Sequence, residues 1–158
     1  MNNSYQEYIN FANTLADVAG ITSMEYFRTS LDINNKSDES PVTIADKNTE
    51  LKIRSMIEKE YPDHGILGEE FDSINPDAEF TWVIDPIDGT RSYIAGHKDF
   101  GNLISLTQNK KPIIGIINCP AHNERWIGVQ SQDSTFNKQP AKTSNVTKIE
   151  NAYLFTSG

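Results

Sequence analysis

Three acidic clusters stand where predicted elements of structure meet, and their side chains are of the type that binds hard cations. Asp46 lies at the start of a predicted helix, Glu69 and Glu70 follow a short predicted strand, and Asp85–Thr90 follows a second strand. Magnesium takes oxygen ligands, commonly one or two protein carboxylates together with substrate phosphate oxygens. Because side chains at such transitions can converge from separate elements, the sequence predicts a site for magnesium and phosphate.

The hexapeptide Asp85–Thr90 has a mechanical logic of its own. Pro86 biases the residue before it toward extended backbone and is expected to end the strand. Gly89 permits a tight turn without the steric penalty of a Cβ atom. Residues from Thr90 to Ala95 can then open a helix whose free N–H groups form an anion cradle. One segment can therefore supply two carboxylates for a cation and donors for a phosphate.

Counting along the hexapeptide excludes other chemistries. A calcium-binding EF-hand loop needs a Glu at its twelfth position, and the twelfth residue from Asp85 is Gly96. An aspartyl-phosphate mechanism would place a second Asp where Ile87 stands, and no Gly-x4-Gly-Lys phosphate loop occurs in the chain. Taken alone, Asp85 and Asp88 could still be a turn residue and a helix cap. The two other acidic clusters favour the site.

Helices and loops that must position these clusters follow from hydrophobic periodicity. Apolar residues at three- and four-residue steps predict an amphipathic helix from about Ser4 to about Arg28. A second helix is predicted from Thr43 to the Pro62–Gly65 turn. The polar segment Ser30–Ser40 between them is predicted to be an exposed loop.

Strand-like runs fill the rest of the chain and set the fold class. They are predicted at 65–67, 80–85, 101–107, 112–118, 125–130 and 152–156. Gln108–Lys111 is a credible hairpin turn between two of them. Two leading helices packed on a largely antiparallel sheet make a layered α+β fold, and 158 residues suit one domain.

Composition excludes several partners. The net charge is −8, from 14 Lys and Arg against 22 Asp and Glu, so neither nucleic acid nor an anionic membrane is expected as a partner. The apolar run Ile113–Asn118 is far shorter than the roughly 20 residues of a bilayer span. The N-terminus lacks the features of a secretory signal, and a cytoplasmic location is expected. Cys119 ends an apolar run and is predicted to pack rather than to act as a nucleophile.

Histidines and tryptophans carry less information. His64 lies in a turn and His122 follows a Pro-Ala turn, so both are expected at the surface. His97 lies close after the phosphate motif and could reach a substrate. Trp82 and Trp126 alternate with their neighbours in strand patterns and are expected in the core or on a sheet face.

Three motifs resemble, in order, those of the inositol monophosphatase family of magnesium-dependent, lithium-sensitive phosphatases. They are Ser40–Asp46 with Glu50, Leu67–Glu70 and Trp82–Thr90. The similarity continues through Gly115–Pro120 and Phe136–Pro140, and so spans essentially the whole chain. Arg91–Gly96 and Phe100–Ile104 resemble the histidinol-phosphatase branch. The resemblance implies the N-terminal portion of a layered, sugar-phosphatase-like fold.

The resemblance also implies a set of metal ligands. Glu69, Asp85 and the backbone carbonyl of Ile87 would hold a first magnesium ion. Asp85 would bridge to a second ion, which Asp88 would share. Glu70 would orient a metal ligand by contacting it, and would not bind the metal itself.

The same resemblance implies catalytic and substrate-binding roles. Thr90, helped by Asp46, would activate the attacking water, and the amides of Gly89 and Thr90 would bind phosphate. Metal coordination can lower the pKa of water from 15.7 to about 7, and paired ions can clamp the attacking and leaving oxygens. The loop that holds Lys36, Asp38 and Glu39 resembles the family's mobile loop that completes the site, with a merely solvated loop as the alternative.

The sequence departs from the family in its second half. Family members supply a further Asp from a Trp-Asp-x-Ala motif, but here Trp126 is followed by Ile127 and the only Asp after Asp99 is Asp133, in a turn context. We therefore expect residues 1–158 to be the N-terminal metal- and phosphate-binding domain of a longer enzyme, with the C-terminal domain absent from this chain. We expect little or no phosphatase activity from this chain alone.

The function expected from these residues is hydrolysis of a small-molecule phosphate monoester by metal-activated water, with Mg²⁺ as cofactor and histidinol phosphate as substrate. An inositol monophosphate and a 3′-phosphoadenosine nucleotide are the alternative substrates. A non-catalytic metal- or phosphate-binding module, or a pseudo-enzyme, is the alternative of another class. A homodimer is left open.

Overall fold

A seven-stranded sheet forms the centre of the computed structural model, which describes residues 5–29, 33–35 and 41–154 of the chain. Its strands follow the chain order, from β3 at one edge to β9 at the other. β3 and β4 are parallel, and every later neighbouring pair is antiparallel. The strands are β3 (Gly65–Gly68), β4 (Phe80–Asp88), β5 (Gly101–Gln108), β6 (Lys111–Cys119), β7 (Glu124–Val129), β8 (Thr135–Phe136) and β9 (Gln139–Pro140).

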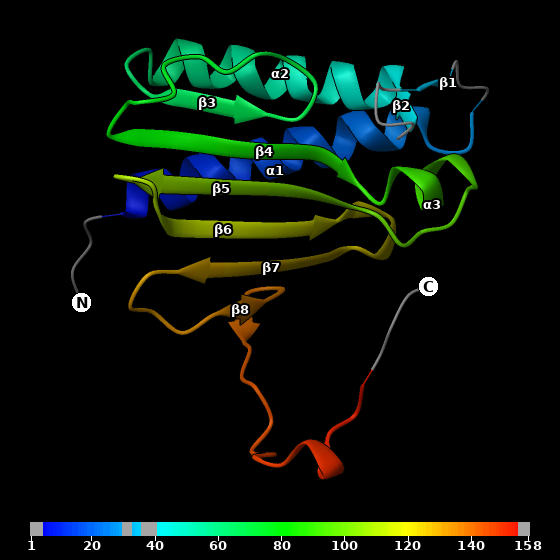
Figure 1. The fold of residues 1–158 in the computed structure, drawn as a ribbon, viewed down its shortest axis with the longest axis vertical. Helices are drawn as coiled ribbons and strands as arrows, with labels where there is room; N and C mark the ends of the chain where they lie inside the picture. The colour runs from blue at the N-terminus through cyan, green and yellow to red at the C-terminus, as the bar shows by residue number, and fades with distance from the viewer. Residues whose placement is uncertain (1–4, 30–32, 36–40, 155–158) are drawn as a thin grey trace.

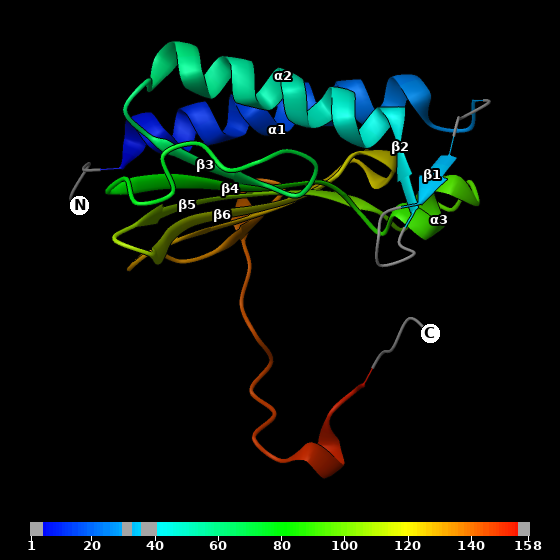
Figure 2. The same cartoon turned by 45° about the horizontal axis from the view of Figure 1, so that its top comes forward.

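Two long helices cover one face of this sheet (Figures 1 and 2). α1 (Gln6–Tyr26) packs on β5 and β6, and α2 (Ile44–Glu60) packs beside it on β3 and β4. Between them in the chain, β1 (Ile33–Asn35) pairs with β2 (Pro41–Thr43). Figure 2 shows that the opposite face of the sheet carries no helix from the described residues, and that the chain after β9 leads away from the sheet. The predicted α+β class, with two leading helices on a largely antiparallel sheet, is confirmed.

The hydrophobic core lies between the two helices and the sheet. α1 turns three alanines toward the strands, and their small side chains let the helix lie close to them. Trp82 of β4 is fully buried, as predicted, and makes an edge contact with Phe11 at 5.5 Å between ring centroids. Burial of a large apolar side chain contributes about 1.5–3 kcal/mol, so this layer fixes β4, the strand that leads into the acidic hexapeptide. The other large buried members are Leu15, Ile53, Ile57, Ile66, Ile84, Ile104, Leu106, Ile113, Ile114 and Ile116.

The start of α2 is fixed by local chemistry. Thr43 caps the helix by accepting a hydrogen bond from the amide of Ala45 at 3.1 Å. Asp46 completes a capping box by accepting from the Thr43 amide at 2.8 Å. The predicted start at Thr43 is therefore confirmed, and the same box holds Asp46 at the end of the helix that faces the acidic hexapeptide.

Other predicted elements are confirmed with small shifts. The turn between β5 and β6 places Asn109 and Lys110 at φ of 50° and 64°, the left-handed pair typical of tight hairpins. A short helix, α3 (Thr90–Ile94), opens after Gly89, as the hexapeptide predicts. Within the described residues, no helix is long and apolar enough to cross a bilayer.

Three predictions about elements are corrected. Pro86 does not end its strand, because β4 continues to Asp88 through a register shift against β5. The predicted strand at 152–156 is absent from its described part, where 152–154 are exposed and irregular after the turn η2 (Ile149–Asn151). The predicted loop at 30–40 contains strand β1, and the remainder of that segment lies outside the described residues.

Candidate metal and phosphate site

Parallel pairing of β3 with β4 brings two of the acidic clusters side by side. The register pairs Gly68 with Ile84. The next residue in each chain, Glu69 after Gly68 and Asp85 after Ile84, therefore lies at the same end of the paired strands. Glu69 lies close enough for its charge to act on the Asp85 carboxylate. Two carboxylates held this close repel each other, so a cation between them is favoured.

The surroundings of Asp85 disfavour its charged form. Burial is the largest cause that raises the pKa of Asp85 from 3.8 to about 7. The interaction with Glu69 and the charge of Asp88 raise it further, against a smaller lowering effect of the Ile87 backbone. Its Oδ1 atom is buried and has no hydrogen-bond partner. A buried, unpartnered carboxylate oxygen beside a second carboxylate fits a hard divalent cation.

The predicted three-carboxylate cage is only partly assembled. Glu69 and Asp85 meet, whereas Asp88 affects Asp85 by its charge but is itself exposed. Across the described ranges 5–29, 33–35 and 41–154, no three His, Cys, Asp or Glu side chains converge into a metal-binding group. Glu69 and Asp85 are thus the two predicted ligands whose carboxylates lie closest to each other's influence.

The conformation of the hexapeptide loop is fixed by the packing of Ile87 and by the turn at Gly89. Ile87 is buried against Tyr93 and Phe100. Gly89 adopts φ of 85°, and a Cβ there would meet the carbonyl of Asp99 at 3.0 Å, so the turn needs glycine as predicted. The register shift between Asp85 and Asp88 has the character of a bulge, which re-aims side chains at a functional edge.

Thr90 and Asp46 are brought together from different elements, as the sequence predicted. The Thr90 hydroxyl lies 3.4 Å from Asp46 Oδ1 and 3.0 Å from the carbonyl oxygen of Ile87. Asp46 is 2% exposed, and its other oxygen accepts from Thr43. One carboxylate therefore caps α2 and orients the threonine at the start of α3.

A buried chain of amide side chains supports the same loop from the other side. Asn102, which is fully buried, donates to the Pro86 carbonyl at 2.7 Å and accepts from Asn118 at 2.9 Å. Asn118 accepts in turn from Arg125, whose guanidinium pairs with Asp17 at 2.7 Å. Sequence reasoning missed this network because Asn102, Asn118 and Arg125 lie on three different strands and Asp17 lies on α1, so no local pattern links them.

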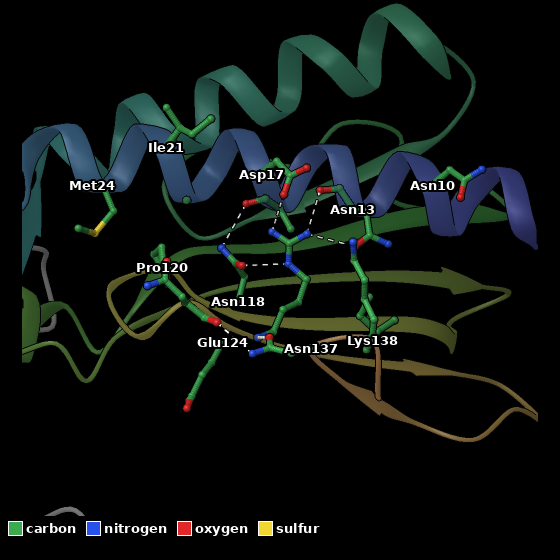
Figure 3. Close-up of a pocket in the computed structure, with 15 residues that line it drawn as sticks. Asn10, Asn13, Asp17, Ile21, Met24, Asn118, Pro120, Glu124, Asn137 and Lys138 are labelled. Carbon is green, nitrogen blue, oxygen red and sulfur yellow. Dashed lines mark hydrogen bonds and ion pairs between the residues drawn. The ribbon is translucent and has the colours of Figure 1, made fainter. Parts of the chain in front are cut away.

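Two hollows lie near these residues. Figure 3 shows a pocket between α1 and the β6–β7 region, with Asp17 and Asn118 among the side chains that line it. Its volume is about 1020 Å³, Arg125 also lines it, and none of the predicted site residues does. A second hollow, of about 650 Å³, lies on the uncovered face of the sheet. Asp85 and Asp88 line this second hollow together with apolar side chains, so it is the one that opens onto the carboxylates.

The remaining predicted residues are placed as follows. Glu70 is half-buried, and its amide, like that of Glu69, donates to Glu50, whose contacts the sequence did not reveal. Burial and nearby acidic residues raise the pKa of the half-buried Cys119, which agrees with a packing role rather than a nucleophile. The predicted loop residues Lys36, Asp38 and Glu39 lie outside the described residues.

His64 corrects an expectation. It is not a surface residue but a half-buried one, stacked on Tyr61 at 4.6 Å and accepting a hydrogen bond from Trp82 Nε1 at 3.2 Å. His122 is exposed, as expected, and pairs with Asp99. His97 is exposed, and its predicted reach toward substrate stays a prediction.

Comparison with solved structures defines the class of the fold. An inositol monophosphatase from Zymomonas mobilis matches 90% of this chain with a TM-score of 0.78 and 44% identity, over 55% of its own chain. The sequence profile of the inositol monophosphatase family matches residues 4–158. The chain belongs to the inositol monophosphatase family of phosphatases, as its motifs predicted.

The sequence is also similar to curated proteins that are named as phosphatases. Bifunctional phosphatase IMPL2 of Arabidopsis thaliana, a chloroplastic protein, is 43% identical over 147 residues, which are 92% of this chain and 42% of that protein. The histidinol-phosphatase of Chlorobaculum parvum is 38% identical over 141 residues, 89% of this chain and 54% of that enzyme. The chain thus spans about half the length of these relatives.

Proposed function

We propose that residues 1–158 form the metal- and phosphate-binding portion of a Mg²⁺-dependent phosphatase that hydrolyses histidinol phosphate. The observation that carries this proposal is the buried, unpartnered Oδ1 atom of Asp85, a half-buried residue that lies beside the exposed carboxylate of Glu69. Support for the substrate comes from relatives named histidinol-phosphatase, one of them 38% identical. A cytoplasmic location belongs to the same proposal.

The residues of the chain would divide the work. Glu69, Asp85 and the Ile87 carbonyl would hold the cation, and Asp88, at the exposed rim, would assist a second one. When bound, Mg²⁺ supplies Lewis-acid polarisation of the phosphoryl group and of an attacking water. The Gly89 and Thr90 amides, at the turn into α3, would bind phosphate oxygens.

Proton handling falls to the threonine. The Thr90 hydroxyl lies between Asp46 Oδ1 and the Ile87 carbonyl oxygen, so both neighbours are acceptors and its proton is directed away from the substrate side. Its oxygen lone pair is then left to accept a hydrogen bond from water. Because Asp46 is buried and held by the capping box, this orientation costs no rearrangement during reaction.

A second candidate function has its own observation. Since no three acidic or histidine side chains converge among the residues that the structure describes, the chain could bind a cation and phosphate without turning over the ester. An inositol monophosphate or a 3′-phosphoadenosine nucleotide would be the alternative ligand in either case.

The test uses the full 158-residue chain with and without Mg²⁺. Binding of histidinol phosphate is measured by calorimetry and release of inorganic phosphate by a colorimetric assay, with inositol-1-phosphate and 3′-phosphoadenosine 5′-phosphate alongside. We expect Mg²⁺-dependent binding that favours histidinol phosphate, and slow release because the sequence lacks the Trp-Asp motif. Asp85→Asn should abolish both, whereas Asp133→Asn, an exposed carboxylate elsewhere, should abolish neither.

Each other outcome has a defined meaning. Binding with no release in the presence of Mg²⁺ would favour the non-catalytic module. Release that persists in EDTA, or in Asp85→Asn, would contradict the metal-based proposal. Preference for the inositol ester would replace the proposed substrate and leave the chemistry in place.

A further inference from the structure

Glu50 is a fully buried acidic residue whose carboxylate reaches the backbone of the Glu69–Glu70 segment. Its Oε2 atom accepts hydrogen bonds from the amide of Glu69 at 3.0 Å and from the amide of Glu70 at 2.8 Å. Its Oε1 atom accepts from Arg54 Nε at 2.7 Å, and the Glu50 side chain is 0% exposed. Three charge-assisted hydrogen bonds hold this carboxylate in a single orientation.

Arg54 extends the same grip further along the chain. One of its guanidinium nitrogens donates to the Phe71 carbonyl at 2.9 Å, and the guanidinium lies 5.7 Å from the centre of the Phe71 ring. Arg54 is itself only 6% exposed. The Glu50–Arg54 pair thus contacts the backbone at three successive residues, Glu69, Glu70 and Phe71.

Gly68 is what allows so close an approach. A Cβ atom at this position would overlap the Glu50 carboxylate and lie 2.8 Å from Arg54 Nη2. Gly68 also ends β3, in register with Ile84 of β4. The strand end and the helix side chain therefore meet directly in front of Glu69.

α2 holds both halves of the site at a fixed spacing. Asp46 and Glu50 are four residues apart on α2, a rise of about 6 Å, and so lie on the same face of the helix. Asp46 reaches Thr90 of the hexapeptide loop, and Glu50 reaches the Glu69 segment. A single rigid helix thus sets the position of one loop relative to the other.

We propose that Glu50 is a positioning residue that fixes Glu69 against Asp85 and so sets the affinity of this carboxylate pair for a divalent cation. The inference rests on the metal site of the proposed function, and it adds a residue that does not itself bind the cation. Loss of a side chain that orients a metal ligand typically lowers metal affinity about 10- to 100-fold.

The test compares Glu50→Gln with a control on the same helix. Glutamine keeps the shape of Glu50, but it cannot accept from Arg54 and from both backbone amides at once. Ile53→Val trims a fully buried side chain of α2 that packs in the hydrophobic core. Mn²⁺ affinity is measured by calorimetry on the 158-residue chain, urea unfolding reports stability, and NMR reports the exchange of the Glu69 and Glu70 amide protons.

In Glu50→Gln we expect Mn²⁺ affinity to fall about 10-fold or more and the two amides to exchange faster. Gly68→Ala, which pushes the carboxylate away, should do the same. Ile53→Val should lose stability and keep the parent affinity. Equal affinity in Glu50→Gln and the parent, or an equal fall in Ile53→Val, would overturn the positioning role.

Failure of the proposed function gives a different pattern. If the parent binds Mn²⁺ and Glu50→Gln binds it weakly, while neither binds histidinol phosphate in the presence of Mg²⁺, the positioning role stands and the proposed function fails. If the parent hydrolyses the ester and Glu50→Gln binds Mn²⁺ as tightly, only the positioning role fails. A parent chain that binds no Mn²⁺ overturns both.

Discussion

Asp85→Asn is expected to stabilise the metal-free protein at neutral pH and to abolish its stabilisation by magnesium. Asparagine keeps the size of the side chain and removes the charge that burial and Glu69 oppose. The pKa of Asp85 is raised from 3.8 to about 7, so between these values the folded protein holds a proton that the unfolded chain has released. The contribution of Asp85 to stability is therefore fully present below pH 3.8 and is lost as the pH rises through about 7.

The size of the effect follows from that shift. For a fully buried group it would correspond to about 4 kcal/mol, and the partial exposure of Asp85 reduces it to roughly 1–2 kcal/mol. In a domain of this length that is about 3–6 °C in Tm. In EDTA at pH 8, Asp85→Asn should thus unfold at a higher temperature than the parent, and at pH 4 the two should converge.

With magnesium present, the parent should become more stable than Asp85→Asn. A cation at about 100 times its Kd stabilises the folded parent by about 2.7 kcal/mol, and Asp85→Asn should gain little. Thermal and urea unfolding, followed by circular dichroism with EDTA or Mg²⁺, measure both effects, with Asp133→Asn as the control. A variant whose pH dependence in EDTA equals that of the parent, or whose response to Mg²⁺ is complete, would refute the reasoning.

Two further predictions concern the support of the site. Asn102→Leu should lower the free energy of unfolding by roughly 2–4 kcal/mol, because the Pro86 carbonyl and Asn118 lose a buried partner; an unchanged urea midpoint would argue against this role. Burial lowers the pKa of His64 in the folded protein from its ordinary 6.5. The contribution of His64 to the free energy of unfolding is therefore fully present above pH 6.5 and is lost as the pH falls through the lowered pKa. His64→Phe keeps a stacking ring and should weaken the acid-side fall in Tm, and an identical fall in parent and variant would contradict the assignment.

Local signals predicted the elements that local chemistry decides. The start of α2 was predictable because Thr43 and Asp46 form its capping box within four residues of chain. The β5–β6 turn was predictable because hairpin loops are selected by their own residues. Of the strand predicted at 152–156, the described residues 152–154 form no strand, because no strand of the described sheet lies beside them to pair with.

Contacts between residues far apart in the sequence decide the features that local signals did not predict. β4 passes through Pro86 because Asn102, 16 residues further on, donates to the Pro86 carbonyl where the ladder shifts. The parallel pairing of β3 with β4, which brings Glu69 to Asp85, cannot be read from either strand alone. The residue types of the site were thus predictable from sequence, whereas Glu50, which touches only backbone and Arg54, needed the tertiary structure.

The central claim is that the Glu69–Asp85 pair is a divalent-cation site. It is tested most directly by crystals of the full chain grown with Mn²⁺, with an anomalous difference map recorded near the manganese absorption edge. The account predicts a peak bonded to the Asp85 carboxylate and to Glu69, absent in crystals of Asp85→Asn. A map with no peak at this pair at saturating Mn²⁺, or with the peak retained in Asp85→Asn, would contradict it.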